Sequence, residues 1–263
     1  MIFDTHAHYD DDAFLADREE VLASLSGQGV KRLIDVGASV KSFPLVREIA
    51  DTHDFVWGAL GLHPDEVGGL TDAFFAELEA VLSDPKIAAV GEIGLDYHWD
   101  VEPHEVQAEA FRRQASLAIR KGLPVIVHSR AAAEDTMTLI RELYGPGTAG
   151  ALLPRKGVIH AYAYSAELAR QYTELGFFLG IGGVLTFKNS KKLKKVVREI
   201  PLTNLLLETD CPYLAPEPHR GERNTSAYLP YVVRAIAEIK EIAPEEVEDV
   251  TWRNACRLFG LPE

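Results

Sequence analysis

Short apolar runs alternate with amphipathic stretches along the whole chain, and this alternation predicts eight units of a strand followed by a helix. The apolar runs predict strands at residues 2–6, 32–36, 55–62, 87–92, 124–128, 157–160, 177–181 and 204–210. Between these runs, apolar residues recur with a helical period, which predicts helices at residues 18–25, 43–51, 73–82, 104–121, 132–143, 166–175, 191–198 and 228–240. A ninth helix is expected at residues 244–258.

Two of the predicted strands are apolar without interruption, in Val125-Ile126-Val127 and Leu205-Leu206-Leu207. Such runs are typical of parallel strands that are buried on both faces. Eight β-then-α units with right-handed crossovers close into a (β/α)₈ TIM barrel, here with an extra C-terminal helix. The competing architecture is an open doubly wound sheet, which should carry a Gly-rich phosphate-binding turn after its first strand. The first strand ends instead in His6-Ala7-His8, so we expect one TIM-barrel domain over residues 1–263.

Side chains that can bind metal ions or carry protons collect where the predicted strands end. In a TIM barrel the carboxyl ends of the strands meet at one mouth, where the active site lies. The residues at or just after these ends are His6, His8, His63, Glu92, His128, His160, Glu208 and Asp210. Each alone has a structural interpretation, such as a surface histidine or an ion-paired carboxylate. Crowded together they would be costly to bury without a cation, so the sequence predicts a metal site.

The predicted site offers ligands of mixed nitrogen and oxygen type, which suit zinc, manganese or cobalt and suit magnesium less well. One or two divalent ions would fit this set. We expect a first ion on His6 and His8 and a second on His128 and His160, with Glu92 bridging the two. Two ions would favour phosphoester cleavage, because they can stabilise both the attacking and the leaving oxygen.

Asp210 and Glu92 are the candidate catalytic residues of this site. Asp210 would touch the first ion and accept a proton from the attacking water. A bound divalent ion can lower the pKa of water from about 15.7 to about 7, so the predicted chemistry is hydrolysis. Asp4 lies two positions before His6, deeper in the first strand, and is expected to orient a ligand.

Five segments of the chain resemble the TatD family of metal-dependent deoxyribonucleases, which are amidohydrolase-like TIM barrels. The segments are Asp4-Thr5-His6-Ala7-His8, Gly61-Leu62-His63-Pro64, Gly91-Glu92-Ile93-Gly94-Leu95-Asp96-Tyr97, the stretch 124–130 and the stretch 206–214. Their order and spacing cover nearly the whole chain. The resemblance implies a TIM barrel and nuclease activity of the 3′–5′ exonuclease type. It also implies a divalent-metal site at His6, His8, Glu92, His128, His160 and Asp210.

The resemblance further implies substrate-side roles for His63 and Glu208, and Arg130 joins them because it ends a matching segment. A structural alternative stays open for two of them: His63 could cap the turn before Pro64, and Glu208 could support Asp210 from below. The chain departs from the family pattern after His160, where Ala161-Tyr162-Ala163-Tyr164-Ser165 replaces Cys-Phe-Ser-Gly. It departs again at Ser226, where the family usually has proline.

The net charge of −13 argues against a general nucleic-acid coat protein, which would be basic. It is compatible with an enzyme that holds phosphates through metal ions and a local basic patch. Lys188, Lys191 and Lys192 are candidates for such a patch, and their spacing places them with Lys195 on one helical face. The alternative is a solvated helix surface.

Tyr97 and Trp99 follow Glu92 in the loop expected above the site. Their rings could stack on a terminal base, or they could close the barrel mouth by packing. The leading hypothesis is a deoxyribonuclease acting on single-stranded DNA or 3′ ends, with RNA as a further candidate. The alternatives are hydrolysis of a small ester, lactone, amide or phosphoester, which the acidic composition favours, and a non-catalytic metal-binding or nucleic-acid-binding module.

The chain has no apolar run of the length needed to cross a bilayer, so no membrane partner is expected. The N-terminus lacks a basic region followed by an apolar stretch, and acidic residues occur by position 10. The two cysteines, Cys211 and Cys256, imply no disulfide framework. These features predict a cytoplasmic protein, and the sequence indicates no obligate protein partner.

Overall fold

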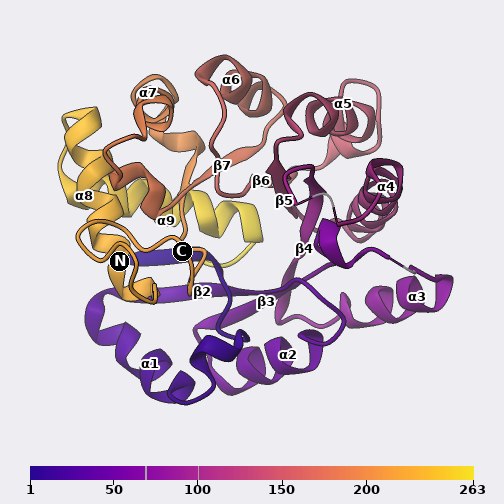
Figure 1. Cartoon of the computed structure of the whole chain (residues 1–263), viewed down its shortest axis with the longest axis horizontal. Coiled ribbons are helices and arrows are strands. Elements are labelled where there is room, and N and C mark those ends of the chain that lie inside the picture. Colours follow the sequence, from indigo (N-terminus) through magenta and orange to yellow (C-terminus); the bar gives the residue numbers. More distant parts are fainter. Residues whose placement is uncertain (69, 100) are drawn as a thin grey trace.

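The computed structural model of the chain contains an eight-stranded parallel sheet, counted over the described residues 1–68, 70–99 and 101–263 (Figure 1). The strand order follows the sequence, and the strands are β1 (Ile2–Ala7), β2 (Val30–Gly37), β3 (Val56–Leu60), β4 (Ile87–Asp96), β5 (Val125–Arg130), β6 (Gly157–Ile159), β7 (Phe178–Ile181) and β8 (Leu205–Leu207). The segment after β8 closes the ring against β1, where the Asp210 amide donates to the His6 carbonyl at 2.9 Å. The predicted TIM barrel is confirmed.

Helices follow the strands around the outside of the ring (Figure 1). They are α1 (Arg18–Leu25), α2 (Phe43–Thr52), α3 (Asp72–Val81), α4 (His104–Lys121), α5 (Ala133–Tyr144), α6 (Ala166–Glu174), α7 (Lys191–Glu199), α8 (Leu229–Lys240) and α9 (Pro244–Phe259). The α4 helix illustrates why the sequence period was informative: Ala110, Phe111 and Ala115 are buried against the barrel, while Glu105 and Glu109 are exposed.

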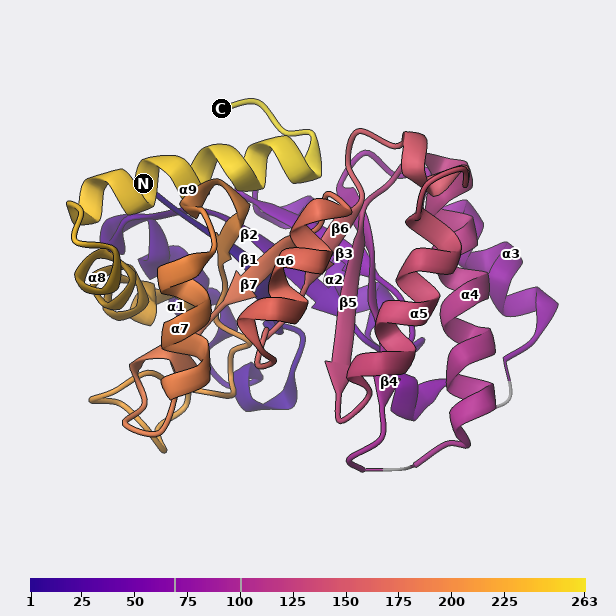
Figure 2. The same cartoon turned by 90° about the horizontal axis from the view of Figure 1, so that it is seen from above.

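The extra C-terminal helix α9 closes one end of the barrel. Each strand contributes at least one apolar residue to a core inside the ring, from Phe3 in β1 to Leu206 in β8, and α9 packs Trp252 and Phe259 into the same core. The ring of Phe3 lies 5.8 Å from the rings of both Trp252 and Phe259. Figure 2 shows α9 across the end of the barrel from which β5 runs away. The carboxyl ends of the strands therefore open at the opposite mouth.

Two strands differ in length from the prediction in ways that shape this mouth. β4 was expected to end at Glu92 but continues to Asp96, because it stays paired with β5 up to the pair Asp96–Arg130. This pairing requires Gly94, which has a φ of +150° and whose Cβ would overlap the His128 carbonyl. β8 ends at Leu207, earlier than expected, and the chain then crosses toward β1.

Gly180 of β7 also makes room at the mouth, since a Cβ there would overlap the Glu208 carboxylate. Among the described residues, no helix combines the length and the apolar character that a membrane span requires.

Candidate metal centre

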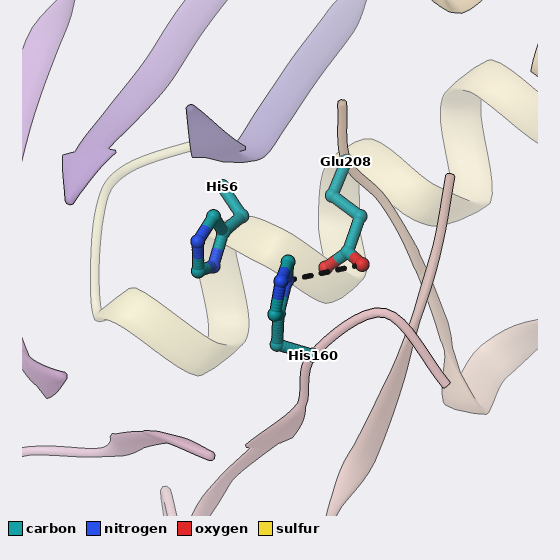
Figure 3. A group of neighbouring side chains, drawn as sticks. All are labelled: His6, His160 and Glu208. Carbon is teal, nitrogen blue, oxygen red and sulfur yellow. Dashed lines mark ion pairs between the residues drawn. The ribbon is translucent and has the colours of Figure 1, made fainter. Parts of the chain in front are cut away.

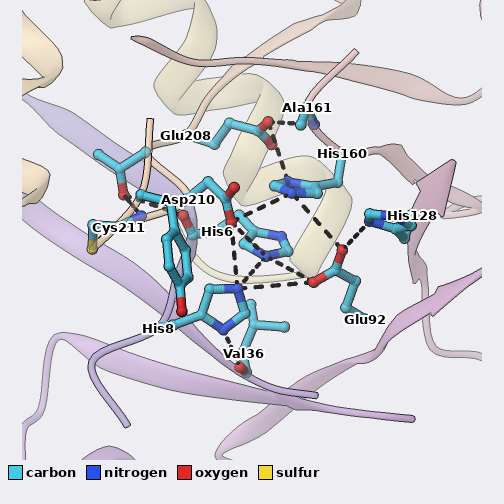
Figure 4. Close-up of polar contacts among 12 residues, drawn as sticks. His6, His8, Val36, Glu92, His128, His160, Ala161, Glu208, Asp210 and Cys211 are labelled. Atoms are coloured by element: carbon cyan, nitrogen blue, oxygen red, sulfur yellow. Dashed lines mark hydrogen bonds and ion pairs between the residues drawn. The ribbon is translucent and has the colours of Figure 1, made fainter. Parts of the chain in front are cut away.

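The predicted ligands meet at the barrel mouth that faces away from α9. A pocket of about 790 Å³ lies there, and five of the six predicted ligands line it, namely His8, Glu92, His128, His160 and Asp210. The sixth, His6, is fully buried. Figure 4 shows these side chains pointing toward one another from β1, β4, β5 and the segments after β6 and β8. Convergence follows from the parallel ring, which gathers all strand ends at one place.

Four ligand atoms form a compact set. His6 Nε2 lies 3.0 Å from His8 Nε2, 3.4 Å from Glu92 Oε2 and 3.8 Å from Asp210 Oδ1. His8 Nε2 lies 3.8 Å from Glu92 Oε2 and 3.4 Å from Asp210 Oδ1. Ligands about 2.1 Å from a zinc-like ion in a tetrahedron would be about 3.4 Å apart. These five distances, each of which includes a histidine, lie around the spacing that a single divalent ion requires.

A hydrogen bond orients the imidazole of His8, and an ion pair orients that of His160, each with Nε2 toward the cluster. His8 Nδ1 lies 2.7 Å from the Val36 carbonyl, which fixes that ring with Nε2 facing His6. His160 Nδ1 lies 3.2 Å from Glu208 Oε1, and the His160 ring stacks on His6 at 3.5 Å between centroids (Figure 3). Metal-binding histidines in proteins have such partners on the second ring nitrogen.

A second, looser group surrounds the other oxygen of Glu92. His128 Nδ1 lies 2.7 Å from Glu92 Oε1, and His160 Nε2 lies 3.9 Å from it. His128 is engaged on both sides, since its Nε2 lies 3.0 Å from Asp96 Oδ2. A cation at this position would have to replace the direct His128–Glu92 contact. The two groups share Glu92, so this carboxylate can serve both.

The carboxylates of the cluster hold protons on its histidines. Burial opposes protonation of His8, yet the Asp210 carboxylate raises its pKa to about 10. Burial likewise opposes protonation of His128 and His160. Asp96 nevertheless helps to raise the pKa of His128 to about 9, and Glu208 helps to raise that of His160 to about 9. Burial and the neighbouring His160 lower the pKa of His6 to about 4, so this ring is neutral.

The carboxylates themselves stay ionised. Burial would raise the pKa of Glu92, but His160 and the hydrogen bonds of His128 and His6 hold it well below its usual range. Burial would also raise the pKa of Asp210, which His160 and His8 lower. The cluster thus needs positive charge, and in this state protons supply it. A divalent ion fits the same demand, because it can replace protons on neutralised imidazoles.

Asp4 joins the two chain segments that carry His6 and Asp210. Its Oδ1 accepts from the amides of His6 at 3.2 Å and Thr209 at 3.1 Å. Its Oδ2 accepts from the hydroxyls of Thr209 at 2.6 Å and Ser226 at 2.7 Å. The departure from the family pattern at Ser226 therefore adds a donor that proline lacks. Asp4 holds the backbone that positions the ligands, as expected for an orienting residue.

The structure separates the predicted substrate-side residues into different environments. His63 lines the pocket with its ring 4.4 Å from that of His128, and its Nδ1 also accepts from the Asp65 amide at 3.3 Å, as a turn cap would. Glu208 is 1% exposed and accepts from the Ala161 amide at 2.6 Å. In this position Glu208 is better placed to orient His160 than to contact a substrate. Arg130 lines the pocket and is exposed.

The lysines of the predicted basic patch lie outside the pocket. Lys188, Lys191 and Lys192 are exposed and stand outside the described pocket lining. The prediction that Lys188 shares a helical face with Lys191 is wrong, because α7 begins only at Lys191. Lys195 pairs instead with Glu167 of α6 at 3.0 Å.

Asp96, in the segment that follows Glu92 at the end of the fourth predicted strand, is a site residue to which the sequence assigned no role. It is 1% exposed and holds His128 from the side opposite Glu92. Its presence in the matching segment after Glu92 was the available signal, and the extension of β4 brings it to the mouth.

Known proteins resemble the chain over its full length. The model of a family described as TatD related DNase matches residues 3–260. The uncharacterized metal-dependent hydrolase YabD of Bacillus subtilis is 42% identical over 261 residues, which is 99% of this chain and 100% of the relative. The uncharacterized metal-dependent hydrolase TatD of Mycobacterium tuberculosis is 37% identical over 268 residues, or 98% and 97% of the two chains.

A solved structure agrees with the sequence relatives. The crystal structure of YjjV, a TatD homologue from Escherichia coli K12, matches with a TM-score of 0.91 and 31% identity, over 99% of this chain and 98% of that one. The family match covers the strand ends that carry the cluster as well as the barrel itself. The chain therefore belongs to the TatD related DNase family.

Proposed function

We propose that the chain is a divalent-metal-dependent deoxyribonuclease of the 3′–5′ exonuclease type, which hydrolyses phosphodiester bonds at single-stranded or frayed ends of DNA. The observation that carries the proposal is the compact set of ligand atoms from His6, His8, Glu92 and Asp210. Every pair in this set that includes a histidine is 3.0–3.8 Å apart. The family membership and the relatives named metal-dependent hydrolases support it.

In this proposal His6, His8, Glu92 and Asp210 would hold a first ion, and Glu92, His128 and His160 would hold a second. Zinc, manganese and cobalt suit the mixed ligands best, and magnesium is a further candidate. When bound, divalent ions supply positive charge for the phosphate and make water nucleophilic at neutral pH.

The chain's own residues position the reactants and move the proton. The Asp210 carboxylate accepts the proton of the attacking water, because it is ionised and reaches the pocket. Glu92 and the buried His6 form the floor under the scissile phosphate. Arg130 and His63 contact the substrate from the rim. A cytoplasmic location, expected from the sequence, is part of the same proposal.

Hydrolysis of a small ester, lactone, amide or phosphoester is the second candidate. The acidic lining of the pocket favours it, since Asp10, Asp11 and Asp65 stand at the rim and would repel a long polyanion. The lysines that could attract such a polyanion lie outside the pocket lining.

A substrate panel separates the two candidates. Purified protein with added manganese or zinc should release nucleotides from 3′-tailed single-stranded DNA, with RNA tested beside it, and a chelator should stop the release. The kcat/KM for small esters and lactones should be lower than that for single-stranded DNA. Rapid hydrolysis of small esters with intact DNA under every metal tested would overturn the nuclease assignment and select the second candidate.

A further inference from the structure

Two exposed aromatic side chains border the pocket on opposite sides of the barrel mouth. Trp99, in the loop after β4, is 61% exposed, and Tyr213, in the segment after β8, is 56% exposed. Both line the pocket that contains the metal-centre residues. In a ring ordered from β1 to β8, β4 and β8 lie across from each other. The two residues therefore follow strands on opposite sides of the ring, and exposed aromatic groups at a pocket indicate a binding site.

Neighbouring side chains contact both rings and leave both residues largely exposed. The Arg130 guanidinium lies over the Trp99 indole, 5.2 Å from its centroid, and the His98 ring packs at 4.8 Å. The Tyr213 hydroxyl donates to Asp11 Oδ2 at 2.8 Å. A ring that is already held in place loses little conformational freedom on binding.

Tyr97 differs from these two residues although the sequence placed it beside Trp99. Its ring stacks on His104 at 3.5 Å with 11° between the planes, and its hydroxyl donates to Asp135 at 2.9 Å. Tyr97 therefore closes the loop by packing, and Trp99 is the aromatic residue of this loop with its ring open to the pocket.

The charge around the pocket explains why aromatic contacts matter here. Arg130 is the sole lysine or arginine among the described residues that line the pocket, and carboxylates stand around the rim. Side-chain cations can therefore contribute little of the salt-dependent affinity that most nucleic-acid-binding proteins use. Stacking on an aromatic ring needs no charge and tolerates any base, because every base has a π-face.

We propose that Trp99 and Tyr213 are stacking platforms for the two bases that flank the scissile phosphate of a single strand. The proposal rests on the nuclease function proposed above and deepens it by naming the substrate groups that are recognised. Bases within a duplex are already stacked, so this arrangement selects single strands and frayed ends. Sequence preference should be weak, and affinity should depend little on salt.

The test uses the full chain as purified and a single-stranded deoxydinucleotide with a phosphorothioate linkage, which resists cleavage. Binding is measured by isothermal titration calorimetry for every variant, and also by quenching of tryptophan fluorescence in proteins that retain Trp99. The other two tryptophans, Trp57 and Trp252, pack against Arg32 near the α9 end and should not respond. A probe with the same backbone and no bases is the comparison. We expect quenching by the first probe and none by the abasic one.

The variants Trp99→Ala and Tyr213→Ala should each weaken dinucleotide binding by about ten- to a hundredfold. Trp99→Phe and Tyr213→Phe should keep most of the affinity, because they retain a ring. The matched control is Leu152→Ala, which removes an 86% exposed apolar side chain before β6, away from the mouth. The Leu152→Ala control should bind the dinucleotide and cleave single-stranded DNA as the wild type does.

Two results would overturn the proposal in distinguishable ways. In the first, the wild-type protein cleaves DNA, and Trp99→Ala and Tyr213→Ala bind the dinucleotide and cleave DNA with unchanged affinity and KM. This result would reject the stacking platforms and leave the nuclease function standing. A wild-type protein that releases no nucleotide from single-stranded DNA with any metal tested would reject the nuclease function, and the platforms with it.

Discussion

Replacing Asp210 with asparagine is expected to lower the kcat for nucleotide release from single-stranded DNA by about a thousandfold, because the proton acceptor is lost. The amide keeps the size of the carboxylate but cannot take up a proton. The backbone should tolerate the change, since Asp210 has a φ of +57° and asparagine adopts this left-handed conformation readily. The rate is measured at saturating metal, so that a weaker metal affinity does not contribute.

Asp12→Asn provides the matched control for this variant. It makes the same change in charge at an exposed position near the mouth, in the short helix Asp12–Phe14, and should leave kcat unchanged. An Asp210→Asn protein that is folded, holds metal and turns over at the wild-type rate would remove Asp210 from the proposed mechanism.

Metal binding is expected to weaken steeply as the pH falls. Of the four atoms in the compact set, His8 Nε2 carries the proton that must leave, since the pKa of His8 is raised to about 10 and that of His6 is lowered to about 4. Below pH 10 the proton competes with the ion, so the apparent affinity for a first ion should rise about tenfold per pH unit between pH 6 and 8. A second ion on His128 and His160, with pKa values of about 9, should release two further protons.

Calorimetric titration in buffers of different ionisation enthalpy counts these protons directly. His53→Gln is the control, because His53 pairs with Glu19 on the outside of the barrel and should leave the proton count unchanged. An affinity that does not vary between pH 6 and 8 would show that the ion binds without displacing the His8 proton, and therefore at other atoms.

The barrel was predictable because local pattern and global architecture agree. Continuous apolar runs such as Val125-Ile126-Val127 are buried in parallel strands, and the predicted helix at 104–121 has the observed bounds. Parallel order then placed the strand ends at one mouth. For this reason His6, Glu92 and Asp210, far apart in the chain, could be expected to meet before any distance was known.

The remaining features depend on tertiary detail that residue types do not encode. The reach of β4 to Asp96 results from its pairing with β5, which the apolar run ending near Glu92 does not reveal. Lys188 was assigned to a helix by spacing alone, yet α7 begins three residues later at Lys191. The hydrogen bond from Ser226 to Asp4 joins residues 222 positions apart, which no local signal predicts.

The most direct test of the account is a metal titration of chelator-treated protein, with bound metal per chain and release of nucleotides from 3′-tailed single-stranded DNA measured on the same samples. We expect the protein to be inactive without metal, to bind one or two divalent ions per chain, and to gain activity as their occupancy rises. Nucleotide release that persists without bound metal, or full occupancy without nucleotide release, would contradict it.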